Sequence, residues 1–308
     1  DCIAYGIQRF AEIILTKWIN NLTKKYKVYD ICFSGGVAQN IKANLLMSNM
    51  QSIKSFLVAP GAGDEGLAIG AAYKCFLKYC DDKEKKVLVS SNPYLGNVYT
   101  NLEIEKIINK SNLKNNFFIK KITKSGIAKL LADGEIIGIF SGQMEFGPRA
   151  LGNRSIIASP SNLETVKTIN KIIKQRDFWM PFAPSILSDD IKKYLKSKKS
   201  ITSKFMTIGC ETTKLAKKHL IATLHPHDGT VRPHIVYKED NSEYYEIIKE
   251  FKKKTGIGAV LNTSFNLHGE PIVCKPLDAI KTFKNSGLTH LVLNSYLIKK
   301  KVEKKCVE

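Results

Sequence analysis

A run of fifteen residues near the middle of the chain carries its densest set of chemically capable side chains. It reads Ser-Gly-Gln-Met-Glu-Phe-Gly-Pro-Arg-Ala-Leu-Gly-Asn-Arg-Ser from Ser141 to Ser155, and it contains Arg149 and Arg154. Glycine keeps the walls of a loop low, and arginine offers forked N–H donors that match the oxygens of a phosphate or a carboxyl-like group. A purely structural loop needs no such pair of arginines. The run therefore predicts a pocket for one of these groups.

The scarcity of arginine elsewhere supports this prediction. Of the 48 Lys and Arg residues, five are arginines, at positions 9, 149, 154, 176 and 232. Where lysine fills almost every basic position, a remaining arginine is a candidate for planar, two-pronged contact to phosphate or carboxylate, which lysine cannot make. Lys174 and Arg176 precede an aromatic segment braced by prolines, although Arg176 could also be a surface charge.

A histidine-containing loop follows further along the chain. The run from His225 to Arg232 also contains His227 and Asp228. Histidines two residues apart beside an aspartate leave a metal site open as one interpretation. We favour the other, in which the loop presents His227 and Arg232 to a polar ligand.

Neutral hydrogen-bonding side chains gather after a late apolar strand. They are Asn262, Thr263, Ser264 and Asn266, in the run Leu-Asn-Thr-Ser-Phe-Asn-Leu-His-Gly-Glu. Turn formation alone would explain several of them. Their number favours recognition of a small substrate through hydrogen bonds.

Two glycine-bearing turns stand near the beginning of the chain. Gly35 and Gly36 separate an expected strand from an expected helix, where free N–H groups at the start of the helix can meet an anion. Asn40 follows in the same run, and a plain strand-to-helix turn is the simpler alternative. Asp64 follows two further glycines, and it can bind a metal, bind a ribose or cap a helix.

Hydrophobic periodicity places these residues on an α/β framework, because strands alternate with glycine turns and helices. We expect helices over residues 2–26, 38–48, 65–79, 102–111, 124–132, 163–174, 242–254 and 277–285. We expect strands or extended segments over residues 29–33, 55–58, 117–121, 136–141, 182–187, 205–210, 258–261 and 290–293.

Composition narrows the range of partners. The net charge of +20 suggests nucleic acid, but the excess is almost entirely lysine spread over many segments, which is typical of a solvated surface. No apolar run is long enough for a transmembrane helix, so no membrane partner is expected. The seven cysteines form no Cys-x-x-Cys pair, and no secretory signal is evident, which favours free thiols in the cytoplasm.

Several of these strings, in this order, resemble the O-carbamoyltransferase family of the nodulation and antibiotic-tailoring type. The strings are SGGVAQN, APGAGDEGLAIGAA, NPYLGNVY, MEFGPRALGNRS, RDFWMPFAPSIL, HDGTVRP and LNTSFNLHGEPIV, and the resemblance runs from about Ile3 to Leu293. It implies an α/β fold of two kinds. Residues 1–88 would be the C-terminal portion of an actin-like carbamoyl-transfer domain of the sugar kinase/actin ATPase superfamily. Residues 89–308 would be a YrdC-like adenylation domain.

The resemblance also implies a reaction. The YrdC-like domain would form carbamoyladenylate from carbamoyl phosphate and ATP, with Mg²⁺, and the actin-like domain would transfer the carbamoyl group to a hydroxyl-bearing acceptor. A divalent metal, with iron as a candidate, would assist transfer, and a homodimer is one candidate assembly. The implied adenylation residues are Arg149, Arg154, Lys174, Arg176, His227 and Arg232. The implied nucleotide- or carbamoyl-binding residues are Gly35, Gly36, Asn40, Asn262, Thr263, Ser264 and Asn266, and the implied metal ligand is Asp64.

One departure from the family limits this expectation. The family carries a metal-binding His-x-x-x-His motif upstream of the position that is residue 1 here, and this sequence contains no such motif. We therefore expect residues 1–79 to be only the second half of the transfer domain. We also expect this chain to be unable to complete transfer alone.

Two other functions stay open at this point. A basic YrdC-like protein that binds RNA would explain the charge, but the aromatic residues are not interleaved with lysine as stacking surfaces require. A relative that acts on another acceptor, such as a maturation or tRNA-modification factor, is the second alternative. The hydrogenase-maturation type would carry a zinc finger, and the cysteine spacing shows none.

Overall fold

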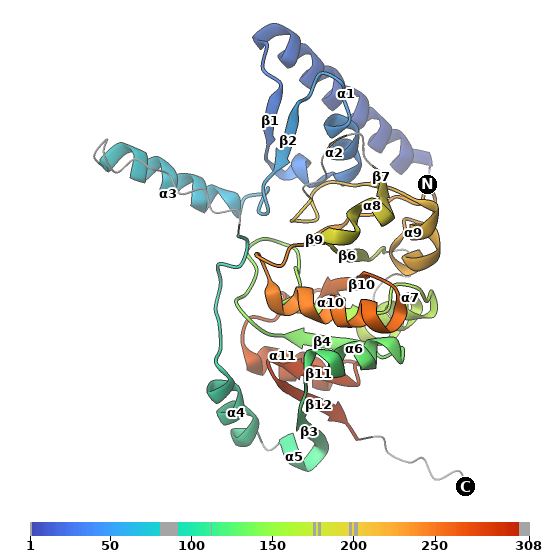
Figure 1. Ribbon diagram of the computed structural model, residues 1–308. Helices are drawn as coiled ribbons and strands as arrows, with labels where there is room; N and C mark the ends of the chain where they lie inside the picture. The colour runs from blue at the N-terminus through green and yellow to red at the C-terminus, as the bar shows by residue number, and fades with distance from the viewer. Residues whose placement is uncertain are drawn as a thin grey trace.

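A computed structural model describes residues 2–80, 92–111, 113–174, 177, 180–196, 199 and 203–301. Within these residues, the larger part of the chain folds around one mixed sheet in the order β3-β12-β11-β4-β5-β10-β6-β9 (Figure 1). The expected α/β class is confirmed. The expected boundary between residues 88 and 89 lies outside the described residues.

The strands of this sheet pair in both directions. β11 with β4 and β6 with β9 are parallel, and the other neighbours are antiparallel. Their bounds are Phe117–Lys121 (β3), Ile137–Phe140 (β4), Arg154–Ala158 (β5), Ala183–Leu187 (β6), His234–Val236 (β9), Ala259–Ser264 (β10), His290–Leu293 (β11) and Tyr296–Lys300 (β12). A separate short pair is Leu195–Lys196 (β7) with Glu211–Thr212 (β8).

Helices cover both faces of the large sheet because successive strand residues point to opposite sides. On one face, α6 (Lys124–Ala132) and α10 (Ser242–Thr255) pack with Ile139 and Val292. On the other face, α4 (Asn101–Lys110) and α11 (Pro276–Asn285) pack with Phe140 and Leu291. The shorter helices are α5 (Leu113–Asn116), α7 (Glu164–Thr168) with a π-helical turn (Ile169–Lys174), α8 (Ile191–Tyr194) and α9 (Lys214–His219).

The N-terminal part is smaller and more open. It comprises α1 (Cys2–Tyr26), β1 (Asp30–Phe33), α2 (Ile41–Ser48), β2 (Ser55–Val58) and α3 (Gly66–Tyr79). β1 and β2 form a parallel pair, and the core between them and the helices includes Ile19, Phe33 and Met47. Among the described residues, no helix is both long and apolar enough to cross a membrane.

Large apolar side chains remain exposed on two helices of this part. Ile3 is 82% exposed and Phe10 67% on α1, and Leu67 is 70% exposed on α3, which buries none of its residues. Figure 1 shows α3 projecting away from the rest of the molecule. Parallel strands are normally covered on both faces, and apolar patches of this kind mark interaction surfaces.

The two parts meet through polar contacts of the α2 region. The Lys199 ammonium donates to the carbonyls of Ser48, Met50 and Ile53 at 2.8, 2.7 and 2.5 Å. The Asn44 amide donates to the Thr207 carbonyl at 2.7 Å. These bonds hold Lys199 and Thr207 against the N-terminal part.

Some sequence expectations need correction. Residues 205–210 do not form a strand, because Met206 adopts a left-handed conformation with φ +58° and only Cys210 makes an isolated bridge. Conversely, Arg154–Ala158 is not among the strands expected from the sequence, but it forms the fully buried strand β5. The polar start of this segment concealed its apolar continuation in Ile156 and Ile157.

Gly152 offers a test of how tightly the loop before β5 is packed. It has φ +110°, and a Cβ there would lie 2.4 Å from the Tyr244 ring of α10. We expect Gly152→Ala to lower the free energy of unfolding by about 3 kcal/mol, through backbone strain plus steric overlap. Urea unfolding would measure this loss.

Gly134→Ala is the matched control, because Gly134 also has positive φ (+90°) but no atom within 4 Å of a Cβ. It should lose only about 1 kcal/mol, the backbone cost alone. Equal losses in the two variants would contradict close packing of the loop on Tyr244.

Candidate functional site

Three chain segments meet at one edge of the large sheet. β4 ends at Phe140, opposite Arg154 at the start of β5, and β10 ends at Ser264, opposite Ser155. The end of β4, the start of β5 and the end of β10 therefore lie side by side. Loops at such a sheet edge are common ligand sites.

A lysine is held at this edge by neutral partners. The buried Lys174 ammonium donates to Ser264 Oγ at 2.9 Å and to Asn266 Oδ1 at 2.7 Å, and Ser264 Oγ donates to the same Asn266 oxygen at 2.7 Å. These two hydrogen bonds fix the direction of the ammonium group. The structure thus brings together three of the residues that the sequence selected.

Asn262 has a supporting place beneath this cluster. Its amide nitrogen donates to Ser185 Oγ at 2.9 Å and to the Ala150 carbonyl at 3.1 Å. Ser185 in turn lies 3.0 Å from Nδ1 of His234, and burial lowers the pKa of His234 to about 3, so that imidazole is neutral at pH 7. Thr263 lies between Asn262 and Ser264 on the strand, so its side chain points to the opposite face.

Arg149 lies where the two parts of the molecule meet. It lines a small cavity of about 10 Å³ with Gln39, Pro60 and Ala62 of the N-terminal part and with Met206 and Thr207. Within the described part of the chain, its guanidinium makes no hydrogen bond or ion pair, and burial lowers its pKa. A half-buried cation without a carboxylate partner is suited to an anionic ligand.

The glycine turns of the N-terminal part lie together. Gly35 N–H donates to the Ala62 carbonyl at 2.7 Å, and Gly35 has φ +105°. A Cβ on Gly35 or Gly36 would meet open space, so the turn is accessible to a ligand. The turn before α3 reaches Arg149 through Ala62, which places both turns near the arginine loop.

Asn40 and Asp64 have different surroundings. Asn40 caps α2, since its Oδ1 accepts from the Ala43 N–H at 3.1 Å, and its amide also donates to Gln8 at 2.9 Å. Asp64 is exposed. Across the described residues, no group of three or more His, Cys, Asp or Glu side chains is placed to hold a metal ion. One carboxylate does not make a metal centre, so the role of Asp64 as a metal ligand stays a prediction.

Arg154 is occupied by the protein itself. Its side chain is fully buried against the Phe140 ring at 3.7 Å and donates to the carbonyls of Ser141 and Asn153 at 2.9 Å each. Its contact with phosphate, which the sequence suggested, stays a prediction. Its geometry is that of a support for the loop.

The other predicted site residues are Arg176, His227 and Arg232. Arg176 lies outside the described residues. His227 is exposed and Arg232 is half-buried. Their loop is anchored to α2 by an ion pair between Asp228 and Lys42. Desolvation by burial acts to raise the pKa of Asp228. The Lys42 ammonium and the hydrogen bonds from Thr230 outweigh it and hold this pKa well below its usual range.

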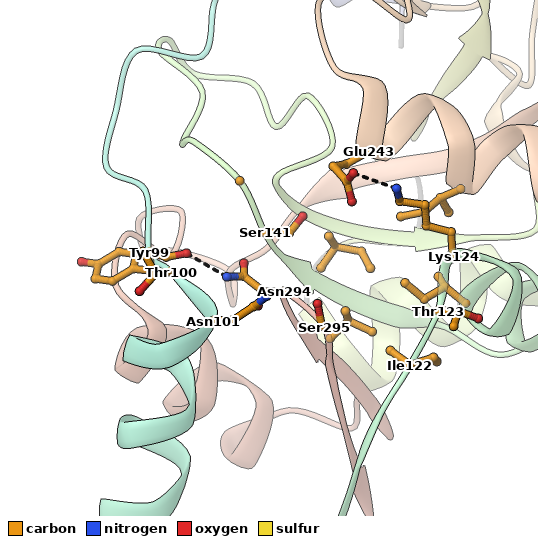
Figure 2. Close-up of a pocket in the computed structure, with 15 residues that line it drawn as sticks. Tyr99, Thr100, Asn101, Ile122, Thr123, Lys124, Ser141, Glu243, Asn294 and Ser295 are labelled. Carbon is orange, nitrogen blue, oxygen red and sulfur yellow. Dashed lines mark hydrogen bonds and ion pairs between the residues drawn. The ribbon is translucent and has the colours of Figure 1, made fainter.

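A cavity of about 580 Å³ that the sequence did not indicate lies at the ends of β4 and β11 (Figure 2). Ile139 and Val292 belong to its apolar floor, and an ion pair between Lys124 and Glu243 spans 2.7 Å at its rim. The other polar residues of its lining are Thr100, Asn101, Thr123, Ser141, Asn294 and Ser295. The one available signal was the Thr-x-x-Glu capping box at the start of α4, which marks a helix end but no ligand.

Arg149 should dominate the affinity of the isolated chain for small phosphate anions. We expect Arg149→Met to weaken pyrophosphate binding about 10- to 100-fold, the value of one or two charge-assisted hydrogen bonds. Isothermal titration calorimetry would measure it. Arg9→Met is the control, because Arg9 is exposed and paired with Glu12 at 3.1 Å, so its loss should leave the affinity unchanged. Equal affinities of the wild type and Arg149→Met would exclude an anion site at Arg149.

Comparison with known proteins finds matches over both parts of the chain. Residues 1–73 match the family described as Carbamoyltransferase N-terminus, and residues 128–300 match the family described as Carbamoyltransferase C-terminus. An uncharacterised protein of Methanocaldococcus jannaschii is 40% identical over 298 residues, covering 95% of this chain and 55% of its own length. Nodulation protein NolNO of Sinorhizobium fredii is 36% identical over 304 residues, covering 97% of this chain and 44% of its own.

A relative with a named acceptor is more distant. The 3'-hydroxymethylcephem-O-carbamoyltransferase of Amycolatopsis lactamdurans is 26% identical over 261 residues, covering 84% of this chain and 47% of its own length. Full-length HypF in its phosphate- and nucleotide-bound form aligns in structure with a TM-score of 0.41 at 18% identity, covering 58% of this chain and 26% of HypF. This chain spans about half the length of the relatives it matches. On the two family matches, the chain belongs to the carbamoyltransferase family.

Proposed function

We propose that this chain supplies the adenylation site of an O-carbamoyltransferase that uses carbamoyl phosphate and ATP. The observation that carries the proposal is Arg149, a half-buried cation without an acidic partner among the described residues, at the junction of the two parts. The held ammonium of Lys174 supports it. Both cations belong to the part that we assign to the YrdC-like class.

The chemistry of adenylation suits such a site. Carbamoyl phosphate loses its phosphate to water, an oxygen of the resulting carbamate attacks the α-phosphorus of ATP, and the bond to pyrophosphate breaks. The protein has little covalent work to do in this sequence. It must hold phosphate oxygens against cations and align the attacking oxygen, and Lys174 and Arg149 offer the charge for this. Mg²⁺ would arrive bound to the phosphates of ATP.

The N-terminal part would receive the activated carbamoyl group. We assign it to the actin-like class, and its exposed turn at Gly35 and Gly36 is open to a ligand close to Arg149. Its uncovered apolar faces on α1 and α3 are surfaces that the additional length of the relatives could cover. The acceptor hydroxyl would then meet the carbamoyl group on this side of the junction.

Pyrophosphate release tests the adenylation step. With ATP, Mg²⁺ and carbamoyl phosphate, we expect release that depends on carbamoyl phosphate and falls at least about 100-fold in Arg149→Ala, because an aligned charge-assisted contact to the transition state is lost. A coupled phosphatase assay on folded protein would measure it. Release that ignores carbamoyl phosphate, or that survives in Arg149→Ala, would reject the assigned site.

Carbamoyl transfer should fail in the chain taken by itself. The open faces of α1 and α3 leave the N-terminal part without a closed acceptor site, so carbamoyladenylate should form without carbamoylated product. Mass spectrometry of mixtures with simple polyols and amino sugars would follow both species. Detection of an O-carbamoylated acceptor made by this chain alone would contradict the expectation.

A further inference from the structure

The loop of residues 141–154 folds around one buried carboxylate. Oε1 of Glu145 accepts hydrogen bonds from the backbone N–H groups of Leu151, Asn153 and Arg154 at 2.7, 2.8 and 3.2 Å. Glu145 itself is 7% exposed. Several N–H groups that converge on one oxygen form a concave anion site, here filled by the protein's own side chain.

Arg154 binds the carbonyl groups of the same loop. We call Glu145 and Arg154 together the frame of the loop. The Arg154 guanidinium donates hydrogen bonds to carbonyl oxygens, whereas Glu145 accepts hydrogen bonds from N–H groups. The carbonyls are those of Ser141, Asn153 and, at 3.2 Å, Asn97. The two side chains therefore tie both ends of the loop, one through its donors and the other through its acceptors. Several backbone groups at the buried end of the loop, residues 150–154, therefore have partners within the protein.

Neighbouring elements secure the same stretch. The Tyr94 hydroxyl donates to the Leu151 carbonyl at 2.8 Å, and the Asn262 amide donates to the Ala150 carbonyl at 3.1 Å. Residues 150–154 are thus held residue by residue. No such bond reaches the Arg149 side chain from the described residues.

The conformation of Arg149 consequently depends on its backbone. Gly147, two residues earlier, has φ +104°, and a Cβ there would lie 2.7 Å from the Pro60 carbonyl oxygen, so the loop tip is seated against the N-terminal part. With Glu145 on one side and Leu151 on the other, the tip has few ways to move. A shift of the frame would carry the guanidinium with it.

We propose that Glu145 and Arg154 are positioning residues that set the Arg149 guanidinium through the main chain of the loop. This assignment rests on the proposed adenylation function for its kinetic consequence. The ligand-binding role that the sequence suggested for Arg154 stays a separate prediction. The position of the Glu145 oxygen matters more than its charge, because three N–H groups need one acceptor at that place.

Three substitutions of Glu145 separate shape from charge. Glu145→Gln keeps an oxygen acceptor at the same reach, Glu145→Asp keeps the charge but withdraws it by one methylene, and Glu145→Ala removes both. We expect kcat/KM for pyrophosphate release to fall less than about 5-fold in Glu145→Gln and about 100-fold in the other two, since a misplacement of about 1 Å can cost that much. An aspartate variant more active than the glutamine variant would overturn the proposal.

A double substitution tests whether the effect passes through Arg149. If Glu145 acts by placing this arginine, Glu145→Ala added to Arg149→Ala should lower kcat/KM by less than about 3-fold further. Multiplicative losses would overturn the proposal. Glu103→Ala is the matched control, since Glu103 also accepts a backbone N–H, from Thr100 at 2.7 Å, but in the cap of α4. It should leave kcat/KM unchanged.

Pyrophosphate affinity and amide exchange keep the inference testable without turnover. In Glu145→Ala, the amides of Leu151 and Asn153 should exchange faster, and pyrophosphate should bind about 10-fold more weakly, while Glu145→Gln restores both. Wild-type protein that releases no pyrophosphate would count against the proposed function alone. Unchanged pyrophosphate affinity and exchange in folded Glu145→Ala would overturn the positioning role, whether or not the enzyme turns over.

Discussion

Residues 150–154, the end of a glycine-rich loop, are buried where they lead into strand β5, so their backbone N–H and C=O groups must find partners with little access to water. The candidate site depends on how they do so. An unpaired buried backbone group costs about as much as a lost hydrogen bond, so such loops normally stay at the surface. Here Glu145 and Arg154 supply partners from within the loop. Burial raises the pKa of Glu145 and the three N–H groups counteract that rise, so the frame offsets the cost of its own burial.

The charges at this site differ in kind from those on the surface. Surface lysines pair with nearby acids, as in Lys129 with Asp133 and Lys253 with Glu250, and exposed pairs of this kind contribute little to stability. Arg149 has no such partner among the described residues, and its burial is unfavourable for folding. A group retained in a destabilising position is typical of a functional site. The net charge of +20 therefore says less about function than the placement of a single arginine.

Much of the framework followed from the sequence. Apolar periodicity located α1, β2, β3 and α6, and the glycine turn at Gly35 was expected where the structure has it. Prediction from the sequence failed where local residue type and tertiary packing favour different structures. Arg154 and Ser155 are polar, so the segment read as a loop, yet antiparallel pairing with β4 and β10 makes it a buried strand. At Met206, a backbone with positive φ interrupts what the apolar residues indicated as a strand.

The candidate site shows the same division. The sequence selected Lys174, Ser264 and Asn266 by chemical type, and only the fold shows that they touch. It also selected both arginines of one loop for the same task, because residue type alone cannot show that Arg154 bonds to carbonyl groups of the loop while Arg149 makes no such bond among the described residues. Glu145 was passed over because a single glutamate carries no periodic or spacing signal. Its contacts form only once the chain has turned back and brought the N–H groups of Leu151, Asn153 and Arg154 to one oxygen.

The contact between Gly147 and Pro60 gives this local frame a longer reach. The arginine loop and the turn before α3 approach so closely that a single methyl group would not fit between them. The backbone of the loop that carries Arg149 is therefore held close to the turn before α3. The exposed apolar faces of α1 and α3 lie on elements that take no part in this contact, so covering them would not require the junction to open. An anionic intermediate formed at the large sheet would lie near Arg149, and it would still lie near Arg149 when it reached the N-terminal part. An adenylation site and a transfer site would therefore share the junction between the Arg149 loop and the turn before α3.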